Sequence, residues 1–140
     1  MCGSTKEAST SNDNFQVRDD FKSASENYTT SFLKAKNAVD KNKSVIILTQ
    51  GFKGEKIVIK QNNKTIYSQY PITNLKKQYA DSFSFLNNDD IVISDQYLKE
   101  DLVLESKKVS SYKFIYIMKE SSNEKSSYKV TLSNTLRPLY

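Results

Sequence analysis

The chain of 140 residues contains no histidine and a single cysteine, Cys2. Histidine is the commonest general base near neutral pH, and histidine and cysteine are the usual ligands of zinc, copper and haem iron. Their scarcity excludes hydrolases built on a Ser-His-Asp triad or a Cys-His pair, and we expect no metal and no cofactor. One cysteine also excludes an intrachain disulfide framework.

Long apolar runs are missing as well. A helix that spans a bilayer needs about 18 or more consecutive apolar residues, and the sequence has no such run. The length fits one domain, which at this size can bury a stable core without disulfides or metals.

Arginine is scarce although the chain is basic. The formal net charge is +5, but only Arg18 and Arg137 are arginines, and the lysines are interleaved with acids. Reading of bases and phosphates favours the forked guanidinium group, so we do not expect nucleic-acid binding. The charge is better suited to an ordinary solvated surface, or to steering an acidic protein or an anionic envelope polymer.

The position of Cys2 is distinctive. It directly follows Met1, and the segment from Gly3 to Asn14 is polar and lacks apolar periodicity. This start resembles the mature end of bacterial lipoproteins, with the signal peptide removed and Met1 as an added start residue. The resemblance implies lipidation at Cys2, a flexible tether over residues 1–14, and a place in the cell envelope facing the periplasm or the exterior. The membrane contact would then be the lipid anchor alone.

One short helix is expected near the start of the domain. Between Asn27 and Lys43 apolar residues recur at helical spacing, and Thr29 or Thr30 is suited to cap the first turn. Upstream, Phe15, Val17 and Phe21 indicate an extended segment that docks on the body. The expected stripe of the helix consists of Phe32, Leu33, Ala35, Ala38 and Val39.

From Ser44 onward the pattern is that of strands separated by turns. Glycines at 51 and 54 and asparagines at 62 and 63 supply two of the turns, and Pro71 stops a strand. About eight short strands predict a mainly β domain over residues 15–140, an antiparallel β-sandwich with one short N-terminal helix. The expected strands lie near residues 45–48, 55–60, 65–70, 79–86, 91–94, 102–105, 113–119 and 128–132.

Acidic residues gather at one place in the sequence. Asp89, Asp90 and Asp95, with Glu100 and Asp101 nearby, offer oxygen ligands of the kind calcium prefers, but their spacing fits no EF-hand loop. The same carboxylates suggest a glycosidase pair, for which no catalytic context is recognisable. We therefore favour a solvated turn whose acids neutralise neighbouring lysines.

Aromatic residues are the other resource. Phe83, Phe85, Phe114 and Tyr116 fit inward strand positions. Others sit at turns or beside Pro71, where exposed rings supply contact area for a partner. The candidate partner-binding residues are Phe52, Lys53, Lys56, Tyr67 and Tyr70.

These observations favour a lipid-anchored, non-catalytic cell-envelope protein that recognises another protein, which the lysines indicate to be acidic. An immunity or inhibitor lipoprotein is one example. The alternative is a carbohydrate- or envelope-polymer-binding module, which the absence of tryptophan disfavours. An enzyme that works with carboxylates or lysines alone is a third reading, and would need a concave pocket that holds several of those groups.

Overall fold

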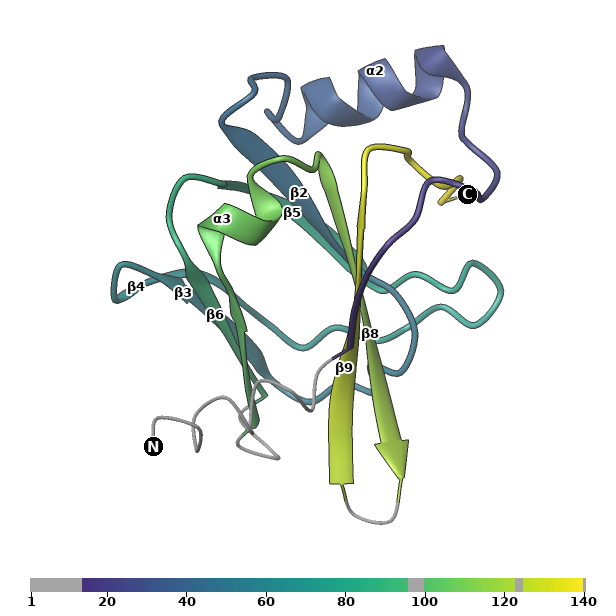
Figure 1. Cartoon of the computed structure of the whole chain (residues 1–140). Helices are drawn as coiled ribbons and strands as arrows, with labels where there is room; N and C mark the ends of the chain where they lie inside the picture. Colours follow the sequence, from purple (N-terminus) through teal and green to yellow (C-terminus); the bar gives the residue numbers. More distant parts are fainter. Residues whose placement is uncertain (1–13, 96–99, 123–124, 140) are drawn as a thin grey trace.

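The structure, a computed structural model, describes residues 14–95, 100–122 and 125–139. Its described strands form two sheets of five and four strands, so the prediction of a mainly β domain is confirmed (Figure 1). In sheet order, the larger sheet consists of β1 (Asn14–Val17), β9 (Lys125–Ser133), β8 (Phe114–Ser122), β2 (Lys43–Leu48) and β5 (Asp81–Leu86). The smaller sheet consists of β4 (Lys64–Gln69), β3 (Ile57–Gln61), β6 (Ile91–Asp95) and β7 (Glu100–Leu104).

Strand pairing corrects the expectation of a purely antiparallel fold. β1 pairs with β9 in parallel, and so does β2 with β8. A parallel pair needs a long crossover connection, and the whole of the smaller sheet lies in the chain between β2 and β8. β1 is the expected extended segment that docks on the body.

Two helices occur in the described part of the chain, so the single helix of the prediction is not confirmed. α2 (Glu26–Ala35) begins earlier than expected because Ser25 is its N-cap, where the Ser25 hydroxyl accepts the N–H of Tyr28 at 3.1 Å. The helix ends near Asn37, whose φ of 55° is left-handed. α3 (Ser106–Val109) is a single turn. Neither is long and apolar enough to cross a bilayer.

The core has two parts. The main cluster contains side chains of both sheets, including Ile46, Ile59 and Ile117, and gives a sandwich-like arrangement in which the sheets share one core. A second cluster lies on the other face of the larger sheet, beneath α2 and the C-terminal segment, which Figure 1 places together at the top. Burial on both faces explains why β2 is apolar at successive positions, such as Val45 and Ile46.

One buried lysine joins the two sheets. The Lys119 ammonium group on β8 contacts the buried Asp95 carboxylate on β6, and it lies 3.3 Å from Glu55, which belongs to the connection from β2 to β3. The Lys119 backbone N–H donates to Gln50 O at 2.9 Å. Gly51, which follows Gln50, lies so close to the Lys119 backbone that an added Cβ would be 1.8 Å from the Lys119 carbonyl oxygen.

This close approach predicts a large cost for Gly51→Ala. Gly54 is the matched control because it also has a positive φ, of 98°, yet its added Cβ would be in ordinary contact with the Ile72 side chain, at 3.5 Å from Cγ1 and 3.7 Å from Cδ1. We expect Gly54→Ala to lower the free energy of unfolding by about 1–2 kcal/mol, the cost of a left-handed alanine. Gly51→Ala should lower it by about 4 kcal/mol or more, because strain and a backbone clash add. Urea unfolding measures both, and equal losses would contradict the clash.

Candidate functional site

The predicted anchor Phe52 does not lie on the surface. Its side chain is 2% exposed and belongs to the core between the sheets. Its backbone N–H donates to the Thr73 hydroxyl at 3.0 Å, and its carbonyl accepts the N–H of Thr73 at 2.8 Å. The connection after β2 is thereby folded against the segment after β4, which turns the ring inward. Assignment of Phe52 as an accessible binding residue is therefore wrong.

Tyr67 is also a core residue rather than a contact residue. It is 8% exposed, and its ring stacks on Phe83 with a centroid distance of 4.6 Å. Its hydroxyl donates to the Asp81 carboxylate at 2.7 Å. Burial, with the hydrogen bond to that carboxylate and its charge, raises the pKa of Tyr67 well above its ordinary value. The prediction that Tyr67 contacts a partner is corrected accordingly.

The other three candidates are exposed and come close together in the fold. Lys53 forms an isolated antiparallel bridge with Ile72. Ile57, the first residue of β3, pairs with Gln69, the last residue of β4. Lys56 and Tyr70 are the next residues beyond that pair, so the bridge and the ladder bracket them. Tyr70 is 62% exposed.

Two large apolar side chains that the sequence analysis missed follow Tyr70 along the same exposed segment, and Ile72 lies opposite Lys53. Ile72 is 67% exposed and Leu75 is 79% exposed. The turn that carries Leu75 is fixed by Asn74, whose side-chain oxygen accepts the N–H groups of Lys76 and Lys77 at 3.0 and 3.1 Å. The sequence does contain a signal for their exposure, because an isoleucine and a leucine stand within a polar, lysine-rich stretch that lacks the alternation of a strand. We call this surface the basic–apolar face: Lys53, Lys56, Tyr70, Ile72, Leu75, Lys76 and Lys77.

The excess positive charge of the chain lies in the segment that contains this face, although Lys60 on β3 and Lys64 on β4 are not part of the face. Of 21 basic and 16 acidic residues, residues 50–79 hold six lysines and one acid, Glu55, which leaves 15 of each sign in the rest of the chain. Glu55 is engaged by Lys119. Among the described residues, no ion pair neutralises the four lysines of the basic–apolar face.

The acidic residues singled out above are divided between the core, which holds Asp95, and one surface cavity, which Asp89, Asp90 and Asp101 line. Asp95 lies on the core side, bound to Lys119, whereas Asp89 accepts the Asn62 amide at 3.1 Å and Asp90 accepts the Ser106 N–H at 2.7 Å. In the described parts of the chain, no group of three or more potential metal-ligating residues forms. The grouping of Asp89, Asp90 and Asp95 as calcium ligands is thus not what the fold provides.

Comparison with protein-family models and with curated protein sequences finds no match. The geometry of this chain is therefore the basis for a functional argument. Cys2 and the expected tether up to residue 13 lie outside the described residues, and β1 begins at Asn14.

Reassignment of Tyr67 to the core makes a prediction for alkaline pH. A tyrosine whose folded-state pKa is raised contributes stability that is fully present below its unfolded value, 10.0, and is lost as the pH rises above it. We expect the wild-type protein to lose stability from about pH 10 upward, and Tyr67→Phe to lose less over that range. A smaller loss should remain in the variant because burial raises the pKa of Tyr116 to about 12.

At neutral pH, Tyr67→Phe should lower the free energy of unfolding by roughly 1.5–3 kcal/mol, the usual value of a hydrogen bond to a charged group. Tyr70→Phe is the control and should leave both the neutral and the alkaline values unchanged. Urea unfolding at about pH 7, 9 and 11 tests this. A parallel alkaline decline in the wild type and Tyr67→Phe would contradict it.

Proposed function

We propose that this protein is a non-catalytic binding protein of the bacterial cell envelope, held to a membrane by lipid on Cys2, and that it recognises an acidic protein through the basic–apolar face. The observation that carries the binding proposal is the combination of three exposed large apolar side chains with four lysines that lack an ion-pair partner among the described residues.

Each half of this combination has a separate role in binding. Tyr70, Ile72 and Leu75 supply apolar area whose burial against a partner is favourable, and tyrosine is enriched among residues that dominate binding energy. The lysines at the rim favour partners of opposite charge and raise the rate of encounter. The side chains of this face carry ammonium groups, one phenol and aliphatic groups. This chemistry is suited to binding a partner rather than to catalysis by proton transfer.

The support of the face is rigid, which lowers the entropic cost of binding. Gly54 N–H donates to Pro71 O at 2.9 Å, and the Thr73 hydroxyl donates to Thr49 O at 2.7 Å. These bonds tie the segment that carries Ile72 to the core-facing Phe52 segment. A pre-ordered surface loses little conformational freedom when it docks.

Site-specific photo-crosslinking in the native cell tests the location of the interface. A photo-reactive residue at Ile72 should yield a discrete adduct with an acidic protein, whereas the same residue at Val39, an exposed apolar position that follows α2, should not. Loss of the Ile72 adduct in Lys53→Glu/Lys56→Glu would show that charge directs the contact. Equal adducts at both positions, or none at Ile72, would contradict the proposal.

Binding kinetics with the crosslinked partner then separate the two contributions. Tyr70→Ala should weaken the complex by on the order of 2 kcal/mol, mostly through faster dissociation. Lys53→Glu/Lys56→Glu should slow association, and added salt should shrink that difference. Lys34→Glu/Lys41→Glu, which replaces two exposed lysines on α2 and after it, is the charge-matched control and should leave both rates unchanged. Binding to vesicles of anionic lipid in place of the protein would identify a membrane surface as the ligand and overturn the assignment.

Lipid anchoring is tested independently of the partner. Expressed from its own gene in its native cell, the protein should incorporate labelled fatty acid and sediment with membranes, and Cys2→Ser should abolish both because the thiol carries the lipid. Ser4→Ala is the control and should leave both unchanged. Membrane association that persists in Cys2→Ser without label would contradict the anchor.

A further inference from the structure

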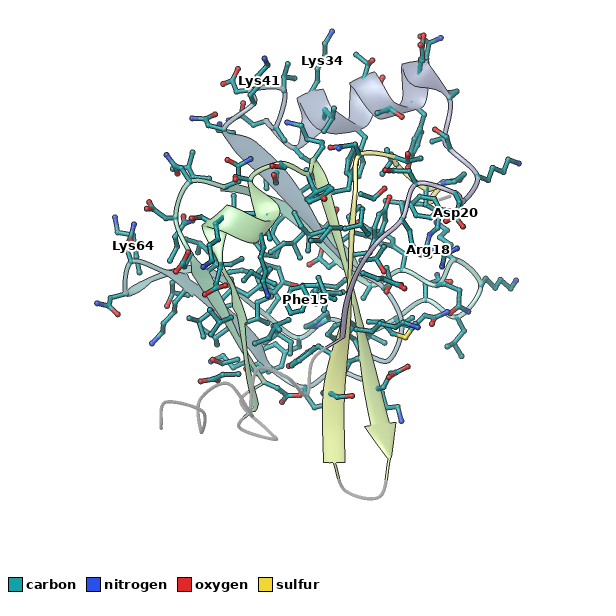
Figure 2. All side chains as sticks on the ribbon, viewed as in Figure 1. Phe15, Arg18, Asp20, Lys34, Lys41 and Lys64 are labelled. Atoms are coloured by element: carbon teal, nitrogen blue, oxygen red, sulfur yellow. The ribbon has the colours of Figure 1, made fainter. Side chains whose placement is uncertain are left out.

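Both arginines of this lysine-rich chain line the same cavity. Its volume is about 220 Å³, and it lies on the outer face of the larger sheet. Figure 2 shows Arg18 and Asp20 beside the C-terminal segment, below the N-terminal end of α2. The cavity is lined by Gln16, Arg18, Phe21, Thr49, Gln50, Tyr116, Met118, Lys129, Thr131 and Arg137.

The strand register explains why a cavity forms there. Met118 pairs with Lys129, and Tyr116 pairs with Thr131, so these side chains share one face of the sheet. The apolar cluster beneath α2 and the C-terminal segment covers the Tyr116 end of this face. The cover stops before Met118 and Lys129, and the cavity lies at that boundary.

The walls are held by hydrogen bonds. One oxygen of Asp19 accepts from Ser133 Oγ at 2.6 Å, Asn134 N at 3.0 Å and Thr135 Oγ1 at 2.9 Å. The hydrogen bond from Ser133 and then those of its neighbours lower the pKa of Asp19, so this connection persists at neutral pH. It fixes the segment after β1 against the chain that follows β9.

Arg137 is anchored on both its backbone and its side chain. Its backbone N–H donates to the Tyr116 hydroxyl at 2.8 Å, and its Nη2 donates to Gln78 O at 3.0 Å. The guanidinium group lies 5.6 Å from the centre of the Tyr116 ring. These contacts orient the group but use only one of its five donors.

The charge around the cavity is positive. None of its lining residues is acidic. Arg18 Nε pairs with Asp20 at 2.9 Å, which leaves the terminal nitrogens of its guanidinium group, and Lys129 has no ion pair among the described residues. Asp20 offsets the charge of Arg18, so Lys129 and Arg137 are the cations whose mutual repulsion an anion between them relieves.

The remaining surface is suited to an apolar body. Phe21 packs edge-on against Tyr116 with a centroid distance of 5.6 Å, and Met118 adds a flexible thioether from the sheet. A cavity of about 150 Å³ accommodates benzene, so the volume here leaves room for a small ring with one polar substituent.

We propose that this cavity binds a small organic carboxylate, with the carboxylate at Arg18, Lys129 and Arg137 and the apolar body against Phe21 and Met118. Arginine forms paired hydrogen bonds with a carboxylate that lysine cannot reproduce, which gives a reason for arginine at these two positions in a chain that otherwise uses lysine. This site is separate from the basic–apolar face and does not depend on it.

The methyl group of Met118 allows a direct test because Met1 is the only other methionine. Protein with ¹³C-labelled methionine methyl groups is titrated with benzoate, and the probe of charge is benzamide, which has the same ring without the negative charge. We expect a saturable shift of the Met118 signal with benzoate, an unchanged Met1 signal, and at least tenfold weaker binding of benzamide.

Arg137→Lys retains the charge but removes the fork and should weaken benzoate binding by about tenfold. Lys129→Gln should weaken it as well, and it keeps the proposal testable if the arginine variant fails to fold. Lys34→Gln on α2 is the matched control and should bind like the wild type. Amide spectra of each variant report its folding.

Three results would overturn the assignment. A linear drift of the Met118 shift without saturation would show that no site exists. Equal affinity for benzoate and benzamide would show that the arginines do not select the ligand. Tighter binding of inorganic phosphate than of benzoate would identify a simple anion site instead of one for an organic carboxylate.

Discussion

The buried contact between Lys119 and Asp95 is the interaction on which the arrangement of this molecule depends. Lys119 belongs to the larger sheet, Asp95 to the smaller sheet, and Glu55, the second partner, to the connection between them. Loss of one member of a buried ion pair costs about 3–5 kcal/mol because the other charge remains without compensation. The charges thus hold both sheets and their connection in one geometry, and Gly51 is required because the chain passes directly against the Lys119 carbonyl.

This geometry decides what the connection presents to solvent. Backbone hydrogen bonds hold the segment of Phe52 against the segment of Thr73, so that Phe52 enters the core. Lys53, one residue later, faces outward opposite Ile72. A contact that stabilises the fold therefore also sets the position of the basic–apolar face. The exposed apolar side chains contribute nothing to the core, and burial against a partner is the physical reason for their position that we favour.

The basic–apolar face and the arginine cavity meet at the turn between Asn74 and Tyr79. The turn between Asn74 and Tyr79 carries Leu75 outward, and its Gln78 accepts hydrogen bonds from both Gln50 and Arg137. Positive charge of the surface segment and of the cavity adds at this turn, which strengthens the field that an approaching anion meets. The two sites differ in chemistry, since lysines on an open surface suit a macromolecule and forked guanidinium groups in a concavity suit a small carboxylate.

The sequence by itself determined the local structure: the β-branched runs that became strands, the asparagine turn after β3, and the mainly β class. These follow from propensity and period, which neighbouring residues set. Only the tertiary structure decided that β1 and β2 have parallel partners, that Phe52 and Tyr67 are buried, and that Arg18 and Arg137 meet across more than a hundred residues. The physical reason is that burial, and the pairing of distant strands, depend on what packs against a residue from elsewhere in the chain, which periodicity does not encode.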